Sequence, residues 1–289
     1  MEMAHIPKQW MRWVQMMMRG DRDSATQYDL RGNVALTRTD AGIPTMNFGY
    51  WRDVAPTAKD ALWAATQALF QLVGETAALS DRDAMVLDAG CGFGTNARYL
   101  AETFGVQRVV GLNVSSLQLA ACRQIARGSA RAAAINFARG SATCMPFADA
   151  TFDKVVSVEA AFHFPPRRQF FAEAFRVLRP GGTLALVDLV GPAPQSTWQR
   201  TAIAMLCRAL QIPHENIYDL DVYRKQLADC GFALCELRSI REDVLTRYKR
   251  WLFRQPVTKL LSLGVPMMMS SAPFLLYPWD YICLKAIKC

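Results

Sequence analysis

Residues that build metal and disulfide sites are scarce or unsuitably spaced in this chain of 289 residues. It has only three histidines, and its eight cysteines include no Cys-x-x-Cys pair. Because structural zinc sites need clustered cysteine and histidine ligands, we expect no metal site. Cysteines inside apolar runs behave as small hydrophobic residues, so we expect no disulfide framework either. This cysteine usage favours a reduced, cytoplasmic compartment.

Features of secreted and membrane-spanning chains are also missing. Lys8 and Arg12 interrupt residues 1–19, and no small-residue cleavage site follows, so no secretory signal is expected. Residues 260–279 carry no charged side chain, but they contain three prolines that would leave backbone groups unsatisfied in lipid. We therefore expect an apolar lid over a binding cavity, with contact at a membrane surface as the alternative.

The chain has no long basic block, although its net charge is +8. Its arginines are spread along the sequence, which fits a solvated surface or an anionic small substrate better than a nucleic-acid groove. We therefore expect a small-molecule partner and no nucleic acid.

Residues 1–45 are predicted to form an N-terminal helical extension. Ile6, Trp10 and Met17 would share one face of a helix, with basic residues elsewhere. Such a helix usually docks on its own domain, and a membrane-surface helix is the alternative.

The most informative feature that is present is a glycine cluster directly after a short apolar run. Gly90, Gly92 and Gly94 follow the acidic end of the segment Val86–Asp88, and a helix-forming segment comes next. Glycine has no Cβ to block a ligand near the backbone, and free N–H groups at a helix start favour polar or anionic ligand groups. The pattern predicts a buried strand that ends in a ligand-binding turn.

Strand-like and helix-like segments alternate along the chain, which is typical of an α/β fold with a doubly wound sheet. The seven predicted strands are Met85–Ala89, Arg108–Leu112, Ile135–Arg139, Lys154–Val158, Thr183–Leu189, Phe232–Arg238 and Tyr281–Ile287. The predicted helices are Thr95–Phe104, Ser116–Arg127, Arg167–Leu178, Thr197–Leu210 and Asp219–Ala228.

The glycine loop, with Asp88 before it, resembles motif I of the class I S-adenosylmethionine (SAM) dependent methyltransferases. Five further segments match that family's pattern, namely Asn47–Trp51, Gly111–Ser115, Met145–Phe147, Ser157–Phe164 and Leu178–Thr183. The resemblance covers roughly residues 45 to 240 and is to small-molecule methyltransferases of natural-product and lipid pathways. It implies a Rossmann-like methyltransferase domain at 46–289, with cap or lid insertions around 191–215 and 240–278.

The resemblance also implies SAM as the cofactor and places ten residues around it. They are Tyr50, Asp88, Gly90, Gly92, Gly94, Asn113, Gln118, Ser141, Ala142 and Glu159. Asn113 and Ser141 stand where many relatives have carboxylates for the ribose and the adenine. The motif Gly-x-Asn-x-Ser-x-x-Gln recurs in a branch with tocopherol and cyclopropane-forming methyltransferases, where the glutamine can contact the ribose, so the resemblance makes Gln118 a candidate for that contact. Ser115 and Gln118 also form a capping box, and the two roles of Gln118 are compatible.

His163 and Asp188 are the predicted catalytic residues. They lie at the ends of the fourth and fifth strands, where open α/β sheets present active-site groups. In the O-methyltransferases that the chain resembles, a histidine and an aspartate at these positions act as general base and orienting partner. An imidazole with a pKa of about 6.5 suits that work. The alternative is that His163 is a core residue in an aromatic run.

These features predict methyl transfer to a lipophilic small molecule in secondary metabolism, at a hydroxyl or at the carboxylate of a polyketide or fatty acid. An alcohol needs a base, so His163 favours a hydroxyl acceptor. The predicted pocket residues are Trp51, Phe162, His214 and Tyr277. The alternative is methylation of a prenyl, terpenoid or aromatic carbon, whose carbocation character aromatic faces would stabilise. We expect a monomer or a homodimer.

Overall fold

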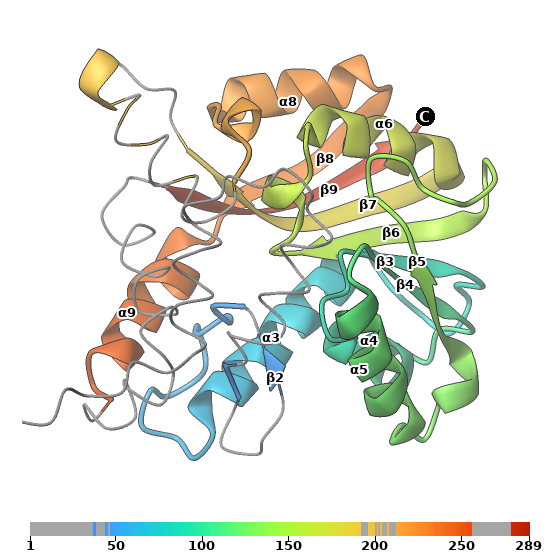
Figure 1. Cartoon of the computed structure of the whole chain (residues 1–289), viewed down its shortest axis with the longest axis horizontal. Coiled ribbons are helices and arrows are strands. Elements are labelled where there is room, and N and C mark those ends of the chain that lie inside the picture. The colour runs from blue at the N-terminus through green and yellow to red at the C-terminus, as the bar shows by residue number, and fades with distance from the viewer. Residues whose placement is uncertain are drawn as a thin grey trace, which may run out of the picture.

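The computed structural model of the chain describes residues 37–38, 44–45, 47–191, 196–199, 201, 203, 207, 212–255 and 279–289. Within these ranges, seven strands form one sheet in the order β5-β4-β3-β6-β7-β9-β8. Strand β9 runs antiparallel to both of its neighbours, whereas the pairs from β5 to β7 are parallel. Figure 1 shows this sheet between two groups of helices.

The strands of the sheet range from 4 residues in β3 to 13 residues in β7. They are β3 (Val86–Ala89), β4 (Val109–Asn113), β5 (Ile135–Arg139), β6 (Phe152–Val158), β7 (Leu178–Val190), β8 (Phe232–Ser239) and β9 (Asp280–Lys288). A separate two-stranded pair joins β1 (Thr37–Arg38) to β2 (Pro44–Thr45). Neighbouring residues of the central strands pack into different cores, as Val86 and Leu87 do. Both faces of the sheet are therefore apolar and need a cover of helices.

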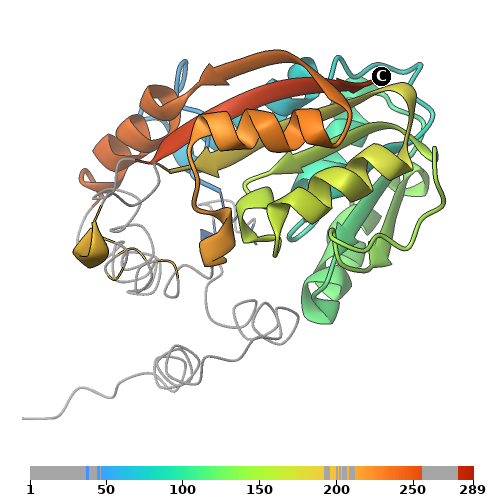
Figure 2. The ribbon, with the colours of Figure 1, turned by 90° about the horizontal axis from the view of Figure 1, so that it is seen from above.

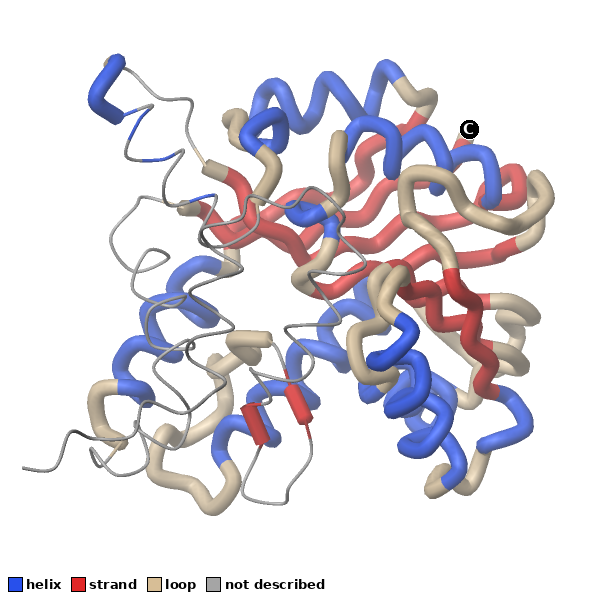
Figure 3. The backbone as a smooth tube through the Cα atoms, viewed as in Figure 1, coloured by secondary structure: helices blue, strands red, loops and turns tan. Residues whose placement is uncertain are grey.

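Helices supply that cover on both faces (Figure 3). They are α3 (Ala61–Thr76), α4 (Thr95–Phe104), α5 (Ser116–Arg127), α6 (Arg167–Val177), α8 (Leu220–Asp229) and α9 (Arg247–Leu252). Helices α6 and α8 lie side by side over one face (Figure 2), whereas α3 and α4 cover the other. There are also three 3₁₀ turns, η1 (Ala132–Ala134), η2 (Ala161–His163) and η3 (His214–Asn216), and a π-helical segment, η4 (Glu242–Thr246), that leads into α9.

The seven predicted strands are all present, and the predicted doubly wound sheet is confirmed. The largest difference is in β7, which begins at Leu178 rather than at Thr183. Leu178 already pairs with Phe152, and the register shifts before Thr183 pairs with Lys154. Helix α6 therefore ends one residue earlier than predicted. Helix α3 was not predicted at all.

Several predicted segments lie wholly or partly outside the described residues. They include the N-terminal helix and, apart from Trp279, the apolar lid at 260–279. Of the predicted helix 197–210, the described positions 197–199, 201, 203 and 207 are helical. After Ile240, within the predicted cap or lid insertion at 240–278, the described residues form the helical elements η4 and α9. In the part of the chain that the structure describes, no helix is long and apolar enough to cross a bilayer.

Candidate functional site

The glycine loop connects β3 to α4 at the carboxyl ends of the parallel strands. Gly90, Gly92 and Gly94 have φ angles of 79°, 52° and 77°, in the left-handed region that glycine adopts without strain. A Cβ at Gly90 would lie 2.5 Å from Ala160 Cβ and 2.9 Å from Phe164 Cζ. The loop thus packs directly against the turn that follows β6. At Gly90 the atoms that leave no room for a side chain belong to this turn of the protein and not to a ligand.

Asp88, just before this loop, is a buried carboxyl group. Its Oδ1 atom accepts a hydrogen bond from Asn96 Nδ2 at 3.0 Å. Its Oδ2 atom is buried and has no hydrogen-bond partner within the described part of the chain. Burial raises the pKa of Asp88 to about 7, against the opposing effect of Asn96. A ligand group that donates a hydrogen bond or carries positive charge would offset the free-energy cost of ionising this buried carboxyl group.

The raised pKa of Asp88 has a measurable consequence for stability. The folded protein holds a proton on Asp88 that the unfolded chain releases near pH 4. The contribution of Asp88 to the free energy of unfolding is therefore complete below that pH and is lost as the pH rises through about 7. Asp88→Asn keeps the shape and the Asn96 contact without titrating. Between pH 4 and pH 8 the variant should gain on the order of 3 kcal/mol of unfolding free energy relative to wild type.

Urea unfolding of the two cofactor-free proteins across this pH range measures the difference. Other titrating groups are the same in both proteins and cancel. A difference in unfolding free energy that stays constant from pH 4 to pH 8 would contradict the raised pKa of Asp88.

Asn113, at the end of β4, ties the glycine loop to helix α5. Its Nδ2 atom donates to the Gly92 carbonyl at 3.0 Å and to Gln118 Oε1 at 2.7 Å. Ser115 Oγ accepts from the Gln118 amide at 3.0 Å, which confirms Ser115 as the N-cap of the predicted capping box. The Ser115 amide itself donates to Asn113 Oδ1 at 3.0 Å. The ribose contacts of Asn113 and Gln118 stay predictions.

Ser141 and Ala142 follow β5 at the same edge of the sheet. Ser141 Oγ lies 2.8 Å from Thr143 Oγ1 and accepts from the Thr143 amide at 3.2 Å. Ala142 is buried. The tight turn places both residues beside the strand that carries Asn113, whose carbonyl accepts from the Gly140 amide at 3.0 Å. Their contact with the adenine stays a prediction.

Glu159, the first residue after β6, joins the N-terminal segment to the site. Its φ of 50° is unusual for a residue with a side chain, and its Oε1 atom accepts from the Phe48 amide at 2.9 Å. Burial raises the pKa of Glu159 to about 8, while the Phe48 amide and the Tyr281 hydroxyl oppose the shift. The Tyr50 amide donates to the Ala65 carbonyl at 2.8 Å. The predicted cofactor residues Tyr50 and Glu159 therefore belong to neighbouring, mutually anchored segments.

His163 is the last residue of the η2 turn, which follows β6 and Glu159. Its side chain is half-buried, and its ring centroid lies 4.1 Å from that of Phe162, which is buried. Its amide donates to the Ala160 carbonyl at 2.9 Å. Because Ala160 also abuts Gly90, the turn that carries His163 is a direct neighbour of the glycine loop.

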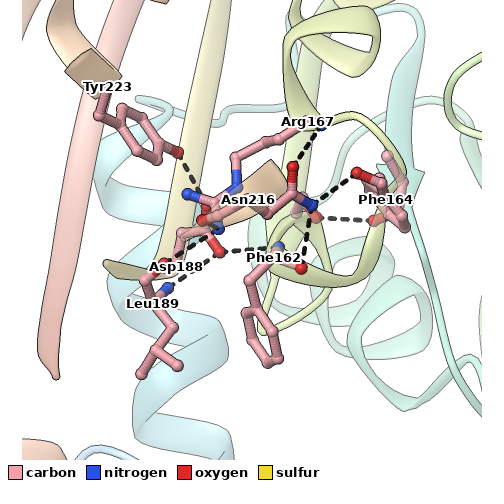
Figure 4. Close-up of polar contacts among 9 residues, drawn as sticks. Phe162, Phe164, Arg167, Asp188, Leu189, Asn216 and Tyr223 are labelled. Carbon is pink, nitrogen blue, oxygen red and sulfur yellow. Dashed lines mark hydrogen bonds and ion pairs between the residues drawn. The ribbon is translucent and has the colours of Figure 1, made fainter. Parts of the chain in front are cut away.

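Asp188 lies fully buried in β7, beneath this turn (Figure 4). Its Oδ1 atom accepts from the amides of Phe162 and Leu189 at 3.0 and 2.9 Å. Its Oδ2 atom accepts from the Tyr223 hydroxyl at 2.9 Å and lies 3.4 Å from Arg167 Nε. Burial raises the pKa of Asp188, and the Arg167 charge opposes that shift.

The side chain of His163 is not among these partners of Asp188. Through the Phe162 amide, Asp188 instead fixes the backbone immediately before His163. The structure thus connects the two predicted catalytic residues by way of the main chain. The chemical roles of both stay predictions.

Three members of this buried network were not predicted from the sequence, namely Arg167, Asn216 and Tyr223. The Arg167 guanidinium contacts two neighbouring aromatic rings, 5.0 Å from the centroid of Tyr218 and 5.2 Å from that of Tyr223. An aspartate within the apolar strand β7 does indicate a buried partner, because an isolated buried charge is costly. It does not indicate which distant residue supplies the partner.

The predicted pocket residues have different surroundings. Trp51 is fully buried and packs against Trp251 at a centroid distance of 5.4 Å, with its Nε1 donating to the Phe48 carbonyl. The His214 side chain is 88% exposed, and its Nδ1 lies 3.0 Å from Glu215 Oε2. Tyr277 lies outside the described residues. The contacts of these residues with a substrate stay predictions.

The carboxyl groups at this edge fit a cationic cofactor such as SAM. Asp88 offers a buried oxygen without a partner, and burial disfavours the charged form of Glu159. Asp88 is the last residue but one of β3, and Glu159 directly follows β6; these two strands pair with each other. Positive charge from a sulfonium or an ammonium group would offset the cost of ionising them.

Comparison with known proteins identifies the family of the chain. A methyltransferase domain family matches residues 87–186, from β3 into β7. Erythromycin 3''-O-methyltransferase of Saccharopolyspora erythraea is 33% identical over 213 residues, which cover 69% of this chain and 65% of that enzyme. An O-methyltransferase of Aspergillus nomiae is 32% identical over 221 residues, 75% of this chain and 92% of its own length.

Among solved structures, geranyl diphosphate C-methyltransferase from Streptomyces coelicolor has the same fold. Its TM-score is 0.70 at 16% identity, and the match covers 96% of this chain and 98% of that one. The chain therefore belongs to the class I SAM-dependent methyltransferases, and SAM is its cofactor.

Proposed function

We propose that the chain methylates a hydroxyl oxygen of a lipophilic small molecule and that His163 is the general base. The observation that supports this most directly is the place of His163, half-buried on a turn that packs against the glycine loop. The similarity to an enzyme named erythromycin 3''-O-methyltransferase supports an oxygen acceptor.

SAM, when bound, supplies an activated methyl group and its own leaving group. The protein's residues then have to orient the acceptor, exclude water and receive a proton. A neutral imidazole at His163 receives the hydroxyl proton as the oxygen bonds to the methyl carbon. A carboxylic acid would need no such base, because it is already ionised at neutral pH. This difference is the chemical reason for preferring a hydroxyl acceptor.

His163→Ala is expected to lower kcat by about 10²-fold or more, because the hydroxyl proton then has no positioned acceptor. The affinity for SAM, measured by calorimetry, should change little. Added imidazole should restore part of the activity of the variant. Wild-type turnover in His163→Ala would remove His163 from the reaction.

The acceptor itself is found by incubating the protein with methyl-labelled SAM and the lipid-soluble fraction of a cell extract. Mass spectrometry then detects the labelled product. We expect a labelled methyl ether of an apolar compound. Label only in methyl esters would place the acceptor among the carboxylic acids.

Carbon methylation is the second candidate. A similar fold occurs in an enzyme named geranyl diphosphate C-methyltransferase, and the aromatic rings of Phe162, Tyr50 and Trp51 lie in the segments around the site. Such rings would stabilise positive charge on a substrate carbon. The NMR shift of the transferred methyl group distinguishes an ether from a carbon-bound methyl.

A cytoplasmic location is part of the proposal. The eight cysteines are free, which supports a reducing compartment. Sedimentation of the full chain, with and without lipid vesicles, tests the predicted monomer or homodimer and the alternative of contact with a membrane surface.

A further inference from the structure

The side chain of Asn216 forms hydrogen bonds to the main chain on both sides of His163 (Figure 4). Its Nδ2 atom donates to the Phe162 carbonyl at 3.1 Å and to the Phe164 carbonyl at 2.7 Å. These are the residues immediately before and after His163. Asn216 itself comes from the η3 turn, 52 positions from Phe164 in the sequence, and it is 2% exposed.

The same side chain is anchored from the other end. Its Oδ1 atom accepts from the Arg167 amide at 2.8 Å, at the start of α6. One Arg167 Nη atom donates to the Asn216 carbonyl at 3.3 Å and to the Leu189 carbonyl at 3.2 Å. The Arg167 guanidinium also pairs with Asp188, which accepts from the Phe162 amide. Asn216, Arg167 and Asp188 therefore form one connected network, the Asn216 network, that ends on the His163 turn.

The chemistry at position 216 specifies an amide side chain. Two carbonyls need two donors, and the Arg167 amide needs an acceptor, all from one short planar group. A side-chain amide supplies two donors and one acceptor oxygen, whereas a hydroxyl supplies one donor and a carboxylate none. Aspartate there would face two carbonyl oxygens with its own oxygens.

We propose that Asn216 is a positioning residue that holds the imidazole of His163 in its working place. The η2 turn is only three residues long and has little regular structure of its own to fix the direction of the side chain. Asn216 holds the carbonyls on either side of His163 by hydrogen bonds, and Asp188 holds the Phe162 amide. Both of these side chains are buried. This inference rests on the proposed role of His163 in the reaction.

The first test needs no acceptor. The chain has three histidines, so the imidazole signals of ¹³C-histidine-labelled protein are few, and His163→Ala identifies the one of interest. In Asn216→Ala the His163 signal should shift or split and its titration midpoint should move. Thr76→Val is the control, because it removes a buried contact of 3.2 Å with Cys283 elsewhere in the fold. There the His163 signal should match wild type.

Asn216→Ser keeps one donor and should give an intermediate change in the His163 signal. If neither variant folds, hydrogen exchange in the wild-type protein decides. Both side-chain amide protons of Asn216 should then exchange slowly, because both donate to carbonyls inside the protein. An unmoved His163 signal in the folded variants, or fast exchange in the wild type, would overturn the proposal.

Turnover separates this inference from the proposed function. Asn216→Ala should lower kcat by about 10- to 10²-fold with unchanged SAM affinity, and it should cause no further loss in the His163→Ala background. If His163→Ala keeps its activity, the proposed base is wrong, and the NMR result still reports on positioning. If His163→Ala is inactive while Asn216→Ala turns over like wild type, the hydrogen bonds of Asn216 do not contribute to the reaction.

Discussion

Gly90→Val is expected to abolish SAM binding, with a loss of affinity of at least about 10²-fold. Gly90 has a φ of 79°, which a β-branched residue adopts only with strain. Its first side-chain atom would lie 2.5 Å from Ala160 Cβ and 2.9 Å from Phe164 Cζ. Relief of that overlap pushes the glycine loop and the His163 turn apart, and both lie at the carboxyl ends of the parallel strands, where we propose that the cofactor and the acceptor bind.

Gly181→Val is the matched control for this variant. Gly181 has a similar φ of 74°, but nothing lies within 4 Å of the position of its Cβ. The control therefore carries the backbone strain without the steric overlap, and it should fold and bind SAM. Circular dichroism checks the folding of both variants, and calorimetry with SAM measures their affinity. A near-normal affinity in Gly90→Val would contradict the packing of the loop described above.

Arg167→Met should lower the free energy of unfolding by about 3–5 kcal/mol. Arg167 is 1% exposed, and its Nε lies 3.4 Å from Asp188 Oδ2, so the substitution leaves a fully buried carboxylate without its cation. The aliphatic part of the side chain is conserved in methionine, which limits the loss of packing against Tyr218 and Tyr223.

Urea unfolding at neutral pH measures this change in stability. Arg168→Met, at the exposed neighbouring position, should change the free energy of unfolding by less than about 0.5 kcal/mol. The double variant Arg167→Met/Asp188→Asn should be more stable than Arg167→Met alone, because it also removes the unpaired charge. Equal stability of Arg167→Met and wild type would show that the pair contributes nothing to folding.

The sheet was predictable because its strands carry local signals. Central strands contain apolar runs, such as Val86–Leu87 in β3 and Leu184–Val187 in β7, and all seven predicted strand segments form strands of the sheet. The early start of β7 was not predictable locally, since Leu178 joins the sheet only through its partner Phe152. Helix α3 could have been found, because Leu62, Leu69 and Leu72 and their neighbours recur at helical spacing and are buried in the structure.

The site was predictable only where it follows the strand ends. Asn113 ends β4, the glycine loop and Glu159 directly follow β3 and β6, and His163 lies on the turn after Glu159. Parallel strands bring their carboxyl ends together, so these residues meet at one edge of the sheet. Asn216 and Arg167 are joined across 49 positions, and no local pattern in the sequence marks that contact. Such long-range hydrogen bonds depend on how α6, η3 and β7 pack.

The proposed reaction is tested most directly by product analysis with methyl-labelled SAM, with wild type and His163→Ala run side by side on the same apolar extract. We expect wild type to form a labelled methyl ether and His163→Ala to form at least about 10²-fold less of it per unit time. A product labelled on carbon, or equal rates for the two proteins, would contradict hydroxyl methylation with His163 as the base.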